Sequence, residues 1–325
     1  MQAILGASGQ IGRELALALK RDVTSDIRLV SRNPRKVNET DSLLAADLLD
    51  AGETARAVAG AEIAFLTAGL PMDTGLWVAQ WPVIMTNVID ACARAGTRLV
   101  FFDNTYMYPQ TSQPKTEETP FQPCGKKGEV RAAIARQLLA AMEQKRLSAM
   151  ICRAPEFYGP GRTQSITNTS IIDRLKQHRP AQVLLRDDTL RSLIYTPDAS
   201  RALARLGNTP DAWGQTWHLP CDDHRLTSRE FIGLAAEIFG TSPRYRVLKR
   251  WQVQLASLFS PAICVGAPAA LRGRQHLRLR QVQGALSRLS RHQLPRRTVR
   301  HTQRPRAIAR LVRRPPDDPL CPVAF

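Results

Sequence analysis

The sequence of 325 residues has no apolar run near the roughly 20 residues that are needed to cross a bilayer. Its start lacks the charged segment and cleavage site of a secretory leader, so we expect a cytoplasmic protein with no membrane partner. The six cysteines are scattered without a C-x-x-C pair, and we therefore predict neither a metal site nor a disulfide framework. The 43% hydrophobic content is enough for the large core of an α/β protein.

A glycine-rich segment, residues 6–12 (GASGQIG), lies between an apolar strand at 3–5 and an amphipathic stretch. Such a turn brings backbone N–H groups and the positive end of a helix dipole close to a diphosphate. Gly6 allows the tight turn, Gly9 the close approach of a phosphate, and Gly12 the packing of helix on strand. We therefore predict a dinucleotide site here. Its expected contacts are Gly6, Ser8, Gly9, Gln10, Ile11 and Gly12.

Segments typical of strands and of helices alternate along the first part of the chain. Strands are expected at 27–30, 63–66, 99–103 and 149–153, with helices from Pro82 to Gly96 and over 129–146. This alternation predicts a doubly wound parallel sheet with right-handed crossovers. The chemistry of such sheets lies at the carboxyl ends of their strands.

The loop after the strand at 27–30 contains three cations and no acid at the strand tip. Residues 31–36 are Ser-Arg-Asn-Pro-Arg-Lys. An acid here would bind the ribose hydroxyls of NAD, whereas an arginine favours the 2′-phosphate of NADP. We therefore expect Arg32 to favour NADP over NAD, although a solvated basic loop also explains these cations.

Further segments occur in the order found in one enzyme family. They are Asp47-Leu48, Thr67-Ala68-Gly69, Asn87, Tyr108, RAPEFYGPG at 153–161, RSLIYTPD at 191–198 and Trp217-His218-Leu219. With the glycine loop, they make about the first 255 residues resemble extended short-chain dehydrogenases/reductases of the NAD(P)-dependent epimerase/dehydratase family. The resemblance implies a Rossmann sheet, a small C-terminal substrate lobe, a nicotinamide cofactor and a small-molecule substrate. It also implies a homodimer formed through helices near 82–95 and 129–146.

The resemblance also assigns residues to the cofactor. Asp47 and Leu48 are similar to the pair that holds adenine, and the nicotinamide is expected near Thr105, Lys127 and residues 155–157. Cofactor contacts are accordingly expected from Asp47, Leu48, Thr67, Ala68, Gly69, Asn104, Lys127, Pro155 and Phe157.

An anion-binding set is expected on the substrate side. Arg191 is similar to a family arginine that faces the phosphates of the substrate. With Arg162 and Asn168, it could bind a phosphorylated or carboxylated substrate, because the guanidinium presents forked donors. A solvated face explains these residues equally well.

The sequence departs from the family where the family has its chemistry. The family uses a Tyr-x-x-x-Lys pair with a Ser or Thr, in which the lysine lowers the tyrosine pKa for proton transfer. Lys127 matches the lysine, but Pro123 stands at the tyrosine position and Asn104 at the serine position. Thr105, Tyr106 and Lys127 are the candidates for a rearranged catalytic set. The alternative is a sensor or regulator that binds the dinucleotide without turnover.

The domain organisation follows from these segments. We expect a Rossmann core at 1–160, rejoined by 190–220, a substrate lobe at 161–189 and 221–262, and an aberrant basic tail at 263–325. Residues 266–325 hold 14 of the 46 Lys and Arg but only two of the 28 Asp and Glu. The tail is also interrupted by prolines, so we predict that it is disordered. Most of the net charge of +18 thus lies outside the body, which disfavours nucleic acid as its partner.

Two hypotheses explain this tail. The first is a basic arm for nucleic acid, whose affinity would fall with salt. The second, which we favour, is a frameshift near residues 260–270. Residues 274–289 can be encoded by codons that, read one base later, specify a peptide with balanced charge and with Tyr and Phe at core spacing. The coding DNA decides between them: without such a continuation in the shifted frame, the frameshift hypothesis fails.

Overall fold

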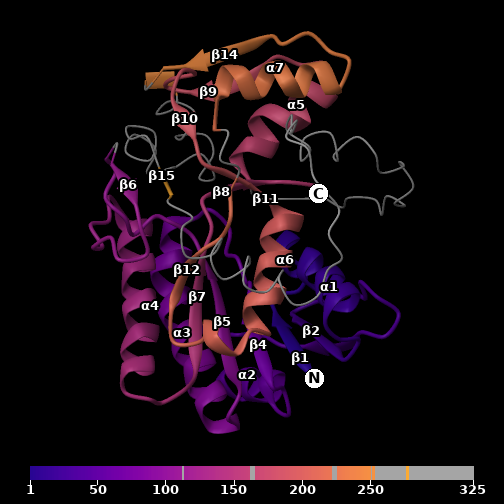
Figure 1. The fold of residues 1–325 in the computed structure, drawn as a ribbon, viewed down its shortest axis with the longest axis vertical. Coiled ribbons are helices and arrows are strands. Elements are labelled where there is room, and N and C mark those ends of the chain that lie inside the picture. Colours follow the sequence, from indigo (N-terminus) through magenta and orange to yellow (C-terminus); the bar gives the residue numbers. More distant parts are fainter. Residues whose placement is uncertain (112, 162–164, 222–224, 250, 253–275, 278–325) are drawn as a thin grey trace.

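A seven-stranded parallel sheet forms the centre of the computed structural model (Figure 1). The structure describes residues 1–111, 113–161, 165–221, 225–249, 251–252 and 276–277. The predictions for Arg162 and, apart from residues 276–277, for the 263–325 tail lie outside these residues. Among the helices in the described ranges, none has an apolar stretch long enough to cross a membrane.

The order of the strands is that of a doubly wound sheet. From one edge to the other they are β12 (Thr216–His218), β7 (Ala149–Arg153), β5 (Arg98–Asp103), β4 (Ile63–Leu66), β1 (Gln2–Leu5), β2 (Ile27–Ser31) and β3 (Ser42–Ala45). In the central strand β1, Ile4 pairs with Leu29 of β2 on one side and Phe65 of β4 on the other. Every residue of β1 and β4 is buried, as expected for parallel strands covered on both faces. The predicted Rossmann fold is confirmed.

Two layers of helices cover the sheet. One layer contains α1 (Gln10–Asp22) and α6 (Thr196–Gly207), and the other contains α2 (Ala51–Val58), α3 (Thr74–Ala95) and α4 (Lys126–Glu143). Each layer encloses its own apolar core against the sheet. Cys92 and Cys152 lie in these cores as free thiols, and burial raises the pKa of the Cys92 thiol to about 12.

Helix α3 differs from the sequence prediction at its start. The predicted helix opens at Pro82, but α3 begins at Thr74, where the Asp73 side chain accepts a hydrogen bond from the Leu76 N–H at 2.8 Å. Pro82 therefore lies inside the helix, which ends at the left-handed Gly96 as predicted. The apolar face of α3, which includes Trp77 and Trp81, is buried deeply enough to outweigh the cost of an interior proline. The sequence prediction missed residues 74–81 because proline is common at the first position of a helix.

A small lobe faces the sheet from the top of Figure 1. Its elements are the π-helix η1 (Asn168–Ile172), α5 (Asp173–Lys176), β9 (Ala181–Leu184), β10 (Leu190–Arg191), β13 (Leu226–Thr227), α7 (Ser228–Ile238) and β14 (Tyr245–Leu248). A capping box formed by Thr227 and Glu230 opens α7. Aromatic and aliphatic side chains from α7, η1 and β9 form a separate core.

The remaining short elements connect the lobe and the sheet. They are β8 (Glu156–Tyr158), β11 (Leu193–Tyr195), the 3-10 helix η2 (Pro210–Ala212), β6 (Pro114–Lys115) and β15 (His276–Leu277). Strands β8 and β11 pair in parallel, and β15 pairs with β6. The β8–β11 pair carries the chain between the carboxyl end of the sheet and the lobe.

Candidate functional site

A cavity of about 1610 Å³ lies between the small lobe and the loops that follow six strands of the sheet. These strands are β1, β2, β3, β4, β5 and β7, and each loop leaves the carboxyl end of its strand. Cavities for one drug-sized ligand are roughly 300–1,000 Å³. The volume is therefore sufficient for an extended dinucleotide together with a second small molecule.

The glycine loop forms one wall through close backbone contacts. Gly6 has a φ of 91°, and a Cβ there would lie 2.4 Å from the Cα of Ala68. A Cβ on Gly12 would lie 2.7 Å from the Cα of Ala7, so Gly12 packs helix on strand without lining the cavity. Gly9 has an ordinary φ of −78°, and a Cβ on Gly9 would meet only the Gly6 carbonyl oxygen, at 3.3 Å. Gly9 is thus not required by packing, and its bare backbone remains available to a ligand.

The start of α1 has the properties of an anion site. No side chain caps the helix at Gly9, and no acid lies in its first turn. The side chain of Gln10 donates to the Pro160 carbonyl at 2.7 Å, which joins this turn to the loop after β8. Backbone N–H groups and the helix dipole are therefore directed into the cavity, and the residues present fit a pyrophosphate.

The loop after β2 is held to the glycine loop. The hydroxyl of Ser8 lies 2.7 Å from that of Ser31 and donates to the Asn33 carbonyl at 3.1 Å. Four cations line this end of the cavity, from α1 and the β2 loop. They are Arg13, Arg32, Arg35 and Lys36. The last residue of β2 is Ser31, so no carboxylate stands where an adenosine ribose would lie in a fold of this kind.

The loop after β3 is fixed by helices of the second layer. Asn87 of α3 donates to the carbonyls of Leu48 and Leu49, both at 3.0 Å. The backbone N–H of Asp47 donates to Glu53 at 2.7 Å, and Asp47 itself accepts from the Leu49 N–H at 3.0 Å. Asp47 and Leu48 both line the cavity, as do Thr67, Ala68 and Gly69 after β4.

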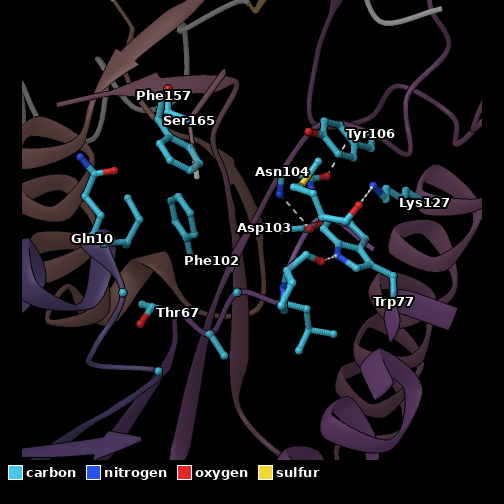
Figure 2. A pocket seen from close by; sticks show the side chains of 18 of the residues that line it. Gln10, Thr67, Trp77, Phe102, Asp103, Asn104, Tyr106, Lys127, Phe157 and Ser165 are labelled. Carbon is cyan, nitrogen blue, oxygen red and sulfur yellow. Dashed lines mark hydrogen bonds between the residues drawn. The ribbon is translucent and has the colours of Figure 1, made fainter. Parts of the chain in front are cut away.

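The third part of the cavity contains the candidate catalytic residues. Figure 2 shows Tyr106 and Lys127 on the same side of the cavity as Trp77. The Tyr106 ring stacks on Trp77 with 6.2 Å between centroids, and the Lys127 ammonium lies 5.6 Å from the Trp77 centroid. Lys127 also donates to the Met72 carbonyl, and Thr105 is 8% exposed. The structure thus brings Thr105, Tyr106 and Lys127 to one wall.

Gly128 determines how closely Tyr106 approaches α4. A Cβ on Gly128 would lie 2.7 Å from the Tyr106 carbonyl oxygen and 3.0 Å from the Cβ of Pro123. Any side chain at position 128 would therefore force the backbone of Tyr106 to move away from α4. Gly128, Trp77 and Phe102 also line the cavity and were not predicted as site residues from the sequence. The Gly125-Lys-Lys-Gly128 pattern was a signal that could have indicated the close contact.

A buried ion cluster supports the end of β5 at this wall, and two of its members, Asp103 and Arg131, also line the cavity. Arg131 Nη1 lies 3.3 Å from Asp103 Oδ1, and Arg153 Nε lies 3.6 Å from Asp103 Oδ2. The Asn104 N–H donates to Asp103 at 2.8 Å, and Asn104 in turn accepts from the Tyr106 N–H at 3.0 Å. The Asp103 carboxylate therefore connects two guanidinium groups to the backbone turn that presents Tyr106.

Asp103→Asn should lower the free energy of unfolding by about 3–5 kcal/mol, because it leaves two buried guanidinium groups without their counterion. Urea denaturation measures the change. The matched control is Asp90→Asn, which removes an exposed ion pair with Arg146 at 2.7 Å and should cost less than about 1 kcal/mol. Equal effects of the two substitutions would contradict the structural role of Asp103.

The hydrogen-bonded core beside this cluster explains two further residues. The Tyr108 hydroxyl lies 2.7 Å from His218 Nε2 and accepts from Arg153 at 2.6 Å. Burial lowers the pKa of His218 to about 3, and the neighbouring Arg153 acts in the same direction. His218 is consequently a neutral histidine with a structural role in the core.

The substrate side of the cavity separates the predicted anion-binding residues. Arg191 lines the cavity, where it forms an ion pair with Glu156. Asn168 is buried outside the cavity lining, and its amide exchanges hydrogen bonds with the backbone of Gly159 at 3.1 and 2.8 Å. It therefore holds the Gly159 turn. Arg162 lies outside the described residues.

The predicted residues otherwise gather at this cavity. The cavity lining includes Gly6, Ser8, Gly9, Gln10, Ile11, Arg32, Asp47, Leu48, Thr67, Ala68, Gly69, Asn104, Thr105, Tyr106, Lys127, Pro155, Phe157 and Arg191. Of the predicted site residues that the structure describes, Gly12 and Asn168 lie behind the wall. Figure 2 also shows Phe102 and Phe157 close together between Gln10 and Asn104.

Comparison with models of protein families shows the family of the chain. The model of the NAD dependent epimerase/dehydratase family matches residues 3–218, and the chain belongs to that family. Comparison with curated proteins found no match.

Solved structures share the fold at low sequence identity. MoeE5 in complex with UDP-glucose and NAD has a TM-score of 0.72 at 20% identity, over 88% of this chain and 92% of that chain. UDP-glucuronic acid 4-epimerase from Bacillus cereus, with UDP-glucuronic acid and NAD, has a TM-score of 0.74 at 14% identity over 88% and 93%. A double mutant of DesIV, the dTDP-glucose 4,6-dehydratase from Streptomyces venezuelae, with NAD and DAU bound, has a TM-score of 0.73 at 18% identity over 96% of each chain.

Proposed function

We propose that the chain is an NADP(H)-dependent oxidoreductase or epimerase/dehydratase that acts on a sugar-like or carbonyl substrate. Family membership and the NAD-bound neighbours support a nicotinamide cofactor. The observation that carries the proposal is the continuity of one cavity. It extends from the uncapped start of α1 to Tyr106 and Lys127, so a dinucleotide held at Gly9 would reach these side chains.

The residues of the wall have complementary roles in this proposal. Tyr106 lines the cavity and is 36% exposed, so its hydroxyl can donate a proton to a carbonyl oxygen there. Desolvation raises the pKa of this phenol, which makes it a weaker acid than a tyrosine whose pKa a lysine lowers. Lys127 brings a positive charge to the same wall, and Thr105 supplies a buried hydroxyl. The bound nicotinamide would supply or accept the hydride. Phe102 and Phe157 provide an apolar surface that excludes water.

A second candidate function is a sensor that binds the dinucleotide without turnover. The observation in its favour is Pro123, which packs on Gly128 at the position of the family tyrosine. The absorbance of NADPH at 340 nm during incubation with a panel of aldehydes, ketones and sugars distinguishes the two functions. Oxidation that depends on substrate and enzyme supports the enzyme. Because an epimerase or dehydratase regenerates its cofactor, NMR of the sugars incubated with NADP⁺-loaded protein checks for an isomerised or dehydrated product. Binding of the nucleotide without oxidation and without such a product supports the sensor.

The cofactor preference provides a separate prediction. NADPH should bind at least about tenfold more tightly than NADH, because a 2′-phosphate near Arg32 and its neighbours gains charge-assisted hydrogen bonds. Arg32→Ser should remove most of this difference, while Arg94→Ser, outside the cavity lining, should leave it unchanged. Titration of nucleotide fluorescence measures both affinities. Tighter binding of NADH than of NADPH by the wild-type protein would contradict this prediction and would mean that the cations of the basic loop are solvated and do not bind a 2′-phosphate.

A further inference from the structure

The arginines on the small-lobe side of the cavity already have carboxylate partners. Arg191 Nη2 contacts Glu156 Oε2, and both side chains are mostly buried. Arg186 makes a two-point contact with Asp188, at 2.9 and 2.8 Å. Among the described residues that line this side, these are the cations, and each is neutralised within the protein.

Glu156 is held in this arrangement from its other side. Its Oε1 accepts from the backbone N–H of Thr167 at 3.0 Å and from the Thr167 hydroxyl. Burial lowers the pKa of Arg191 to about 10, so the guanidinium is still charged at neutral pH. The pair is therefore a salt bridge within the cavity wall, with its carboxylate fixed by Thr167.

The two ends of the cavity consequently differ in charge. The cofactor end has four lining cations from α1 and the β2 loop. Among the described residues, the lobe end has two arginines paired with carboxylates, the apolar Val183, Leu184 and Leu190, and uncharged polar side chains such as Gln182 and Thr189. A diphosphate at the lobe end would have to displace the partly buried carboxylate of Glu156 or lie beside it. Removal of one partner from a buried ion pair, or placement of like charges together, is strongly unfavourable.

We propose that the substrate is an uncharged carbonyl compound or alcohol, not a sugar nucleotide, and that Glu156 determines this specificity by neutralising Arg191. The inference rests on the proposed function and narrows its substrate class. It also separates this chain from the neighbours whose structures contain UDP-glucose or UDP-glucuronic acid. The cavity has Trp77 and Tyr106 on one side and Phe157 on the other (Figure 2), and such aromatic surfaces suit a ligand held by packing and a few hydrogen bonds.

The test is calorimetric titration of the NADP⁺-loaded protein with UDP and with UDP-glucose. The wild-type protein should bind neither below about 1 mM, and Glu156→Gln should bind both at least about tenfold more tightly, since Arg191 becomes available to phosphate. Glutamine keeps an acceptor for Thr167, which favours retention of the fold. Asp188→Asn, which releases the exposed Arg186, should produce a smaller gain.

Tight binding of UDP-glucose by the wild-type protein overturns the inference, and so does weak binding that Glu156→Gln leaves unchanged. NADP⁺ affinity is measured in each preparation and shows whether the variant is folded. If Glu156→Gln fails to bind NADP⁺, Glu156→Ala and Arg191→Ala replace it, with a gain expected only for Glu156→Ala. Failure of wild-type NADP⁺ binding would contradict the proposed function, whereas UDP binding by NADP⁺-loaded wild-type protein would contradict only the substrate class.

Discussion

Replacement of Tyr106 by Phe is expected to lower kcat by about 10²- to 10⁴-fold, the usual contribution of a positioned proton donor. The ring remains, so its stacking on Trp77 and the shape of the cavity are retained. Stopped-flow measurement of NADPH oxidation gives kcat. Fluorescence titration should show that the affinity for the cofactor changes by less than about threefold, or about 0.7 kcal/mol.

Two further variants make this result specific. Lys127→Met should also reduce kcat, whereas Lys20→Met, an exposed lysine that bonds Thr40, should not. Tyr245→Phe removes a hydroxyl bonded to Asp187 outside the cavity lining and serves as the phenol control. Unchanged kcat in Tyr106→Phe would transfer the proton donation to another group, and the proposed catalytic set would be wrong.

Gly6→Ala is expected to reduce the stability of the fold, whereas Tyr106→Phe should leave the fold intact. Its φ of 91° is costly for alanine, and its Cβ would lie 2.4 Å from the backbone of Ala68. We expect a loss of about 2–4 kcal/mol of stability, or failure to fold, because the overlap is with backbone and not with a flexible side chain. Thermal and urea unfolding measure the loss.

Gly9→Ala separates folding from cofactor binding. Its Cβ meets only the Gly6 carbonyl at 3.3 Å, so the fold should be stable, while NADPH affinity should fall by at least about tenfold. Gly233→Ala is the matched control, because no atom lies within 4 Å of its Cβ position. If Gly9→Ala binds NADPH normally, the pyrophosphate does not lie on this turn.

The sequence was sufficient to predict the sheet and the glycine loop because both depend on local signals. Apolar strands, small turn residues and the capping box each indicate an element without reference to distant residues. The start of α3 was not predictable in this way, because its stability comes from the burial of Trp77 and Trp81 against α4 and β5. The error displaced the predicted boundary by eight residues and hid Trp77 from the predicted site.

The charge pairing in the cavity also depends on tertiary structure. Arg191 and Glu156 are 35 positions apart. Arg191 ends β10, and Leu193, two residues later, pairs with Glu156 where β11 lies parallel to β8, so this pairing brings the two side chains together. A motif comparison therefore predicts a phosphate-binding arginine, whereas the structure shows that its charge is compensated. Asn168 is similar: its residue type suggests a ligand contact, but the fold uses its amide for the Gly159 turn.

The hydrogen bond from Gln10 to the Pro160 carbonyl has a consequence for synthesis of the chain. The nucleotide turn is made early, yet one of its supports is 150 residues downstream. Helix α1 also packs on α6, where the Ser200 hydroxyl donates to the Ile11 carbonyl at 3.2 Å. A nascent polypeptide that ends before α6 would therefore expose the apolar side of α1. Until residue 207 has been synthesised, this surface is open to aggregation and to binding by chaperones.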